Sequence, residues 1–418
     1  MNTVCQTGQF VNQFFRDTGA GKNRSRTAVS QGLIMCYNKY MKKLSITKQN
    51  TWLWLLGISL GLFALAGLFY LSAMNGGLIY RSLYPGFSIR VIKALGRISS
   101  LLPFSVFESG ITLVILAALA WLARILLKKQ GLKAFGTWLC AVLLICAYLT
   151  CSFVVFWGVN HFGKDLYTKL DMAHQDYTKE DLYQAGLLCI ENANRLAENL
   201  PKNEKGGILM PSLQEQAKTA RSGFASIADA CPAIPMPGNA PKPLLYTPIY
   251  SYTGFTGFIF AFTGESCVSA NTYPSALPLT MTHELSHAIA VASEDEANFL
   301  GFLACLNNDS PLAPYFQYSA WYHGYMWCAN SLIRIDADLG YDLVYRCGQA
   351  FAADLRATND HYRPYDGKVQ EAAQQVNDSY LKFYKEEAGV ETYDHAVSYV
   401  VNWYLDGCPF VNDNHPTP

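Results

Sequence analysis

Three long apolar segments near the N-terminus constrain the fold of this chain more than any other feature. They cover about residues 51–74, 109–127 and 135–159. Each is long enough to cross a bilayer as a helix, which takes about 20 residues. The first exceeds the roughly 7–15 apolar residues of a cleavable signal peptide, and no small-residue cleavage site follows it. We therefore expect three N-terminal transmembrane helices.

These segments divide the chain of 418 residues. We expect an N-terminal tail over 1–48, a membrane domain over 49–160 and a catalytic domain over 161–418. Residues 1–40 are polar and lack periodicity, whereas Met41-Lys42-Lys43-Leu44 resembles a natural start ahead of an apolar run. We hypothesise that translation begins at Met41 and that 1–40 is not expressed. The alternative is a cytoplasmic tail.

The distribution of charge predicts the orientation in the membrane. Basic residues precede the first apolar segment and separate the second from the third: Lys42, Lys43, Lys48, Arg124, Lys128, Lys129 and Lys133. By the positive-inside rule these lie in the cytoplasm, which places the chain from about 160 onward outside it. The segment between the first two runs is also basic, and its alternation with apolar residues predicts a helix on the membrane surface. Seven cysteines after residue 160 would then occupy an oxidising compartment where disulfides form.

The segment Thr282-His283-Glu284-Leu285-Ser286-His287 carries the chemistry. In a helix, His283 and His287 lie on one face and present their imidazoles to a common point. Zn²⁺ accepts such nitrogens and, when catalytic, favours three protein ligands and one water. Glu284 is placed to act as general base on that water without occupying the metal.

A third ligand must come from the acidic residues that follow. A straight helix would carry them roughly 10 Å past His287, so we expect a turn at residues 291–293 and a second helix capped by Ser293. We favour Glu294 as ligand, with Asn298 on the same helix face to orient a ligand histidine. Glu296 is the alternative metal ligand.

The surrounding sequence predicts a mainly helical α+β domain. Helices are expected over 179–200, 213–230, 319–338, 341–356, 369–386 and 394–404, and one or two strands over 252–269. A strand near 264–268 is the candidate for the edge of a peptide-binding cleft. The residues available to stabilise an oxyanion are Tyr322, His323, His361, Tyr393 and His395, and the sequence assigns none of them.

These features together resemble a family. The chain looks like the bacterial membrane family catalogued as domain of unknown function 3810, which carries a zincin-like signature. The matching stretches are 84–85, 103–105, 262–265, 282–287, 294–300 and 377–382, and the resemblance covers about 45–405. More distantly, Glu294 and Asn298 are similar to the Glu-x-x-x-Asp element of gluzincin peptidases, where the Glu is the third zinc ligand and the Asp steadies a ligand histidine. Here an amide replaces that carboxylate, and it accepts a hydrogen bond without supplying charge.

We therefore expect a membrane-anchored, zinc-dependent metallopeptidase, multi-pass in a bacterial cytoplasmic membrane with its catalytic domain outside. Zn²⁺ is the expected cofactor, and a peptide or protein substrate and the lipid bilayer are the expected partners. Equal numbers of basic and acidic residues, 32 each, argue against a nucleic-acid partner. The alternative function is a zinc-stabilised membrane sensor or binding module with little or no turnover. The sequence fixes neither the substrate nor the oligomeric state.

Overall fold

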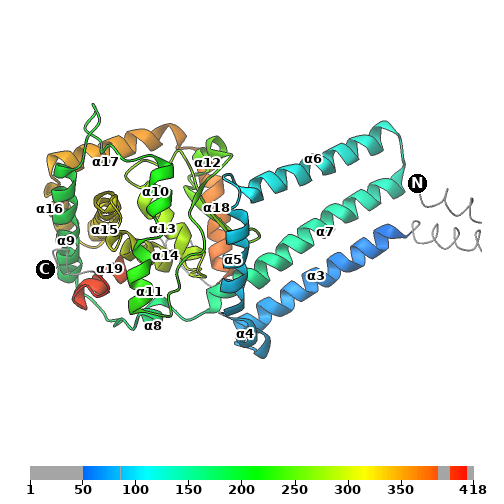
Figure 1. Ribbon diagram of the computed structural model, residues 1–418, viewed down its shortest axis with the longest axis horizontal. Coiled ribbons are helices and arrows are strands. Elements are labelled where there is room, and N and C mark those ends of the chain that lie inside the picture. The colour runs from blue at the N-terminus through cyan, green and yellow to red at the C-terminus, as the bar shows by residue number, and fades with distance from the viewer. Residues whose placement is uncertain (1–49, 85, 385–395, 412–418) are drawn as a thin grey trace, which may run out of the picture.

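The computed structural model describes residues 50–84, 86–384 and 396–411. The fold is mostly helical, with a small sheet (Figure 1). Three long helices project from one side of a helical body, and the short helices α4 and α5 lie at the junction (Figure 1). The expected tail and the hypothetical start at Met41 lie outside the described residues.

The projecting helices are α3 (Thr51–Met74), α6 (Val106–Leu127) and α7 (Leu132–Phe156). All three are long and apolar enough to cross a membrane, and α7 continues through the 3-10 helix η1 (Gly158–Phe162). Nearly all of their large apolar side chains are exposed or half-buried, as expected of side chains that face lipid. The second helix begins three residues earlier than expected because the Ser105 hydroxyl accepts a hydrogen bond from the Glu108 N–H and caps it. These helices are compatible with a membrane protein.

The helices α4 (Leu78–Leu83) and α5 (Gly86–Ser99) connect the first two projecting helices. The segment between the first two apolar runs, in which basic and apolar residues alternate, is therefore helical, as expected. Its Ile92 face is covered by protein rather than left for lipid, because Ile92 packs with Trp157, Ala261 and Ala292. The absence of a side chain at Gly96 lets α5 lie against the backbone of Gly264, since a Cβ atom on residue 96 would lie 2.6 Å from the carbonyl oxygen of Gly264.

Glu265 links the helical body to the projecting helix α6 through hydrogen bonds. Its carboxylate accepts hydrogen bonds of 2.9 Å from the N–H groups of Val106 and Phe107, in the first turn of α6. It also pairs at 2.7 Å with Lys242, whose side chain is almost fully buried. Negative charge at a helix N-terminus is favourable, so this contact stabilises the junction.

The sheet has the strand order β1-β3-β2, with β1 (Lys242–Pro243), β2 (Gly257–Phe260) and β3 (Glu265–Val268). One or two strands were expected over 252–269, and two form. The expected position of the edge strand is wrong: β3 pairs with β1 on one side and β2 on the other, and all four of its residues are buried. The edge strand beside the cleft is β2.

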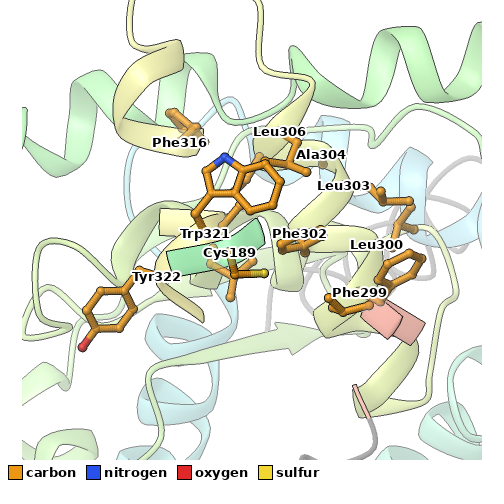
Figure 2. Close-up of a cluster of buried hydrophobic side chains, with 14 of the residues drawn as sticks. Cys189, Phe299, Leu300, Phe302, Leu303, Ala304, Leu306, Phe316, Trp321 and Tyr322 are labelled. Atoms are coloured by element: carbon orange, nitrogen blue, oxygen red, sulfur yellow. The ribbon is translucent and has the colours of Figure 1, made fainter. Parts of the chain in front are cut away.

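The core of the body is formed by α9 (Lys179–Asn199), α13 (Leu277–His287), α14 (Glu294–Leu306) and α15 (Ala313–Ile335). Reciprocal hydrogen bonds between Thr178 and Asp181 cap α9 as a capping box. Phe299 and Phe302 of α14 pack with Trp321 of α15 and Cys189 of α9 (Figure 2). This buried cluster holds α14 in place beside α13.

The remaining helices surround this core. They are α8 (Leu166–Leu170), α10 (Leu213–Thr219), α11 (Gly223–Ala230), α12 (Thr247–Thr253), α16 (Ala337–Tyr345), α17 (Gln349–Tyr362), η2 (Arg363–Tyr365), α18 (Lys368–Phe383) and α19 (Ala396–Leu405). The single helix expected over 213–230 is two, α10 and α11, and Gly223 at the start of α11 lies too close to the carbonyl of Ala304 on α14 for a side chain. Among the described cysteines, none forms a disulfide.

Candidate metal centre

The helix α13 places His283 and His287 one turn apart on one face. Pro278 lies in its first turn, where the missing N–H costs nothing. On the other side, Met281 and Leu285 are fully buried in the core. The two imidazole rings lie 4.5 Å apart between centroids and are nearly perpendicular, at 86°. Both rings therefore face one point in front of the helix.

The chain turns after His287, as expected. Ala290 adopts a positive φ of 67°, and the Val291 N–H donates back to the Ser286 carbonyl. The helix α14 then begins at Glu294, with Ser293 at its N-cap; the expected hydrogen bond from the helix to the Ser293 side chain is not made. The turn returns the chain to the histidines within six residues, which a continued helix would not do.

Glu294 completes a group of three potential ligands. One carboxylate oxygen is 3.2 Å from Nε2 of His283 and the other is 3.7 Å from Nε2 of His287. One atom from each of the three residues lies within 4.8 Å of the others, the only such group among the described residues. Glu296 is elsewhere: its carboxylate accepts a 2.8 Å hydrogen bond from the Leu166 N–H.

The second nitrogen of each imidazole is held by an acceptor. Nδ1 of His287 lies 2.7 Å from the Val291 carbonyl oxygen, and Nδ1 of His283 lies 2.9 Å from Oδ1 of Asn298. A carbonyl oxygen only accepts, so Nδ1 of each ring carries a proton, and Nε2 is the nitrogen that faces Glu294 and would be available to a metal once it is deprotonated. Two such nitrogens and one carboxylate are the donor set that suits zinc in catalytic sites. The residues present therefore fit a divalent metal of this kind.

The charges of the three groups are coupled. Burial alone would lower the pKa of His287, but the adjacent Glu294 carboxylate and its hydrogen bond raise it to about 9. Burial alone would raise the pKa of Glu294, but the two histidines hold it well below its ordinary value. The carboxylate is thus ionised over the whole physiological range and ready to neutralise a cation.

Glu284 lies beside this group without belonging to it. Its side chain is buried, and burial raises the pKa of Glu284 to about 7, although the two histidines act to lower it. One of its carboxylate oxygens, Oε2, has no hydrogen-bond partner in the described chain. The carboxylate packs against the backbone of Gly257 on β2. A buried carboxylate that has one oxygen without a hydrogen-bond partner and a pKa near neutrality has the properties of a general base.

A cleft of about 730 Å³ opens over these residues. The edge strand β2 forms one wall through Gly257, Phe258 and Ile259. Other walls come from Trp157 at the end of α7 and from Tyr380 on α18. The Trp157 ring stands edge-on to His287 at 5.4 Å, and its indole N–H donates to the Tyr380 hydroxyl over 3.3 Å. The last turn of a projecting helix thus contributes directly to the site.

Of the five candidates for an oxyanion residue, three are described by the structure, and of these three only His323 lines the cleft. Its Nδ1–H donates to the Ser319 carbonyl at 2.8 Å, and burial lowers its pKa to about 4. Tyr322 instead bonds Thr358, and His361 bonds the Asn271 carbonyl. Tyr393 and His395 lie outside the described residues.

Local sequence patterns do not mark Gly257, Trp157 or Tyr380 as residues of the site. The sole signal for Tyr380 was its place in the stretch 377–382, which resembles the family. Nothing in the local pattern distinguished Trp157 from other aromatic residues of an apolar helix. All three reach the cleft through contacts between segments far apart in the sequence.

A family model described as "Protein of unknown function (DUF3810)" matches residues 80–401, well over half of the chain. No curated protein and no solved structure matches the sequence or the fold of this chain.

Proposed function

The chain belongs to the family described as protein of unknown function (DUF3810), and we propose that it is a membrane-anchored, zinc-dependent metallopeptidase of zincin-like, gluzincin type. One observation carries the proposal: His283, His287 and Glu294 offer ligand atoms within 4.8 Å of one another. Glu284 lies in the same cleft, outside this group.

His283, His287 and Glu294 would hold the zinc ion. When bound by three protein ligands, zinc acts as a Lewis acid and lowers the pKa of a coordinated water toward about 7. Asn298 and the Val291 carbonyl fix the two imidazoles through Nδ1, so that both Nε2 atoms would be available to bind the ion. The protein thereby supplies a rigid, preorganised donor set.

Glu284 transfers the protons. It takes a proton from the attacking water as the water oxygen bonds to the scissile carbonyl carbon. It then delivers that proton to the amine nitrogen as the C–N bond breaks. Burial, which raises the pKa of Glu284 to about 7, makes it competent both to accept and to release a proton near neutrality.

Tyr380 and His323 act on the substrate in different ways. The Tyr380 oxygen already accepts from Trp157, and Nε2 of His161 lies 3.0 Å away. Tyr380 lines the cleft, and we propose that its hydroxyl donates to the developing oxyanion when the substrate is bound. His323 is neutral, with its proton on Nδ1, so its Nε2 accepts and positions a substrate N–H.

The free edge of β2 suits an extended peptide. One edge of β2 is paired with β3. The residues of β2 line the cleft beside Glu284. An extended chain added to this edge makes backbone hydrogen bonds that do not depend on sequence. We therefore propose a peptide or protein substrate, lying along β2.

The location completes the proposal. We propose that the three apolar helices anchor the protein in a bacterial cytoplasmic membrane, and the basic residues before α3 and between α6 and α7 support an orientation with the site on its outer face.

The test uses the full-length protein in mild detergent with a mixture of peptides, analysed by mass spectrometry. We expect cleavage that a chelator abolishes and zinc restores. Glu284→Gln should retain one zinc per chain but lose hydrolysis, whereas Glu371→Gln, at an exposed position on α18, should behave as wild type. Full activity of Glu284→Gln would refute its role as base. Zinc binding without cleavage of any peptide by the wild type would instead favour the sensor or binding module, for which the uncharged Asn298 is the one structural argument.

A further inference from the structure

A second cavity, of about 580 Å³, lies between the helical body and the segments that follow α3 and α7. Tyr80 and Tyr84 from the α4 segment line one side, and Phe162 at the end of η1 lines another. Ile234 and the turn at 289–291 line the cavity on the side of the helical body. The cavity is therefore mainly apolar and is shared between the junction and the body.

The charged residues of its lining are all basic: Arg81, Lys164 and Lys169. Lys169 is compensated by Glu296, 3.8 Å away. Arg81 and Lys164 are exposed at the rim, and neither forms an ion pair with another described residue. An apolar cavity thus carries two uncompensated positive charges at its mouth.

The position of the cavity connects it to the bilayer. Tyr80, Tyr84 and Phe162 also pack into the cluster that joins α3 to α7, which includes Ala66 and Ala73 of α3. The apolar wall therefore continues along two helices that are apolar enough to cross a membrane. Aromatic and basic side chains at the end of such helices are typical of the level of the lipid headgroups.

We propose that this cavity binds an anionic phospholipid of the surrounding bilayer. Arg81 and Lys164 hold the phosphate, and the glycerol and the start of an acyl chain lie against Tyr80, Phe162 and Ile289. Basic pockets beside transmembrane helices recognise anionic headgroups in this way, and a phosphate near two cations gains charge-assisted hydrogen bonds. This site is independent of the peptidase activity proposed above.

The inner wall of the cavity is the turn that holds the metal centre. Val291 lines the cavity and its carbonyl oxygen accepts from His287. A bound lipid therefore contacts the segment that orients a metal ligand, on the side away from the cleft.

The test measures lipid binding to the full chain in a neutral detergent by native mass spectrometry. The probes are phosphatidylglycerol, phosphatidylcholine and inorganic phosphate. We expect phosphatidylglycerol to bind more tightly than phosphatidylcholine, and Arg81→Gln with Lys164→Gln to weaken it roughly 30-fold, from the loss of two surface cations. The matched control, Arg90→Gln with Lys133→Gln, removes two exposed cations that do not line the cavity and should bind as wild type.

Unchanged affinity of the double variant for phosphatidylglycerol would overturn the proposal, as would equal affinity of the wild type for phosphatidylcholine. Displacement of the lipid by millimolar inorganic phosphate would show a site for free phosphate and would also overturn it. Lys164→Gln alone provides the same comparison, with a smaller expected loss, if the double variant does not fold.

Discussion

The carboxylate of Glu284 packs directly against the backbone of Gly257, so the candidate base is positioned by the strand that borders the cleft. A Cβ atom on residue 257 would occupy the place of the carboxylate. Gly257→Ala should therefore displace Glu284 and lower kcat/KM by roughly 10²-fold, the cost of a shift of about 1 Å in a reacting group. Zinc content should stay at the wild-type level, because the change leaves the three ligands in place.

Metal analysis and peptide hydrolysis on the same preparation check this. Gly110→Ala on α6 is the control, since a Cβ atom there would meet nothing within 4 Å. Wild-type kcat/KM in Gly257→Ala would contradict the proposed position of the base.

Tyr380 is the proposed hydrogen-bond donor to the oxyanion. Tyr380→Phe should lower kcat by about 10²-fold with little change in KM, because the bond is made mainly in the transition state. Tyr341→Phe, at an exposed position on α16, should have no effect. A Tyr380→Phe variant with normal kcat would remove Tyr380 from the mechanism.

Asn298 orients His283 through the 2.9 Å contact at Nδ1. Its loss in Asn298→Ala should weaken zinc binding by roughly 10- to 100-fold, as for other partners of metal-bound histidines. Asn298→Asp keeps the acceptor and adds charge, so it should bind zinc at least as tightly as wild type. Competition with a chromogenic chelator measures both affinities, and equal zinc affinity of the Ala variant and the wild type would count against this role.

Glu265 and Lys242 form a buried ion pair that is part of the junction with α6. Glu265→Ala leaves the Lys242 ammonium buried without its partner and should destabilise the fold by about 3–5 kcal/mol. Urea unfolding in mild detergent measures the change. Asp378→Ala breaks an ion pair whose Lys382 is half-exposed and should cost at most about 1 kcal/mol; equal losses in the two variants would show that burial of the Glu265 pair is unimportant.

Glu284 should make the metal-free protein less stable as pH rises. Burial raises its pKa from 4.5 to about 7, so the folded state binds the proton more tightly than the unfolded state. Stability is then lost as pH rises from 4.5 to 7, by an amount on the order of 3 kcal/mol. In the presence of chelator, Glu284→Gln should unfold at a higher temperature than wild type above pH 7 and at a similar temperature near pH 4. Parallel pH profiles for the two proteins would contradict the raised pKa.

The sequence determined the features that depend on neighbouring residues. The lengths of the apolar runs predicted α3, α6 and α7 because a bilayer requires about 20 residues of helix. The spacing of His283 and His287 placed them on one helix face, and the rise of 1.5 Å per residue required the turn that brings Glu294 back. Both predictions rest on the fixed geometry of the α-helix.

The tertiary structure alone decided which distant segments meet. The sequence predicted one or two strands over 252–269, but the pairing order, which leaves β2 at the edge, depends on β1 from a separate segment. The placing of Trp157 and Tyr380 beside the histidines depends on how α7 and α18 pack against the body. Such contacts join segments that are distant in the sequence, and they are selected by the packing of the whole core, which no local spacing encodes.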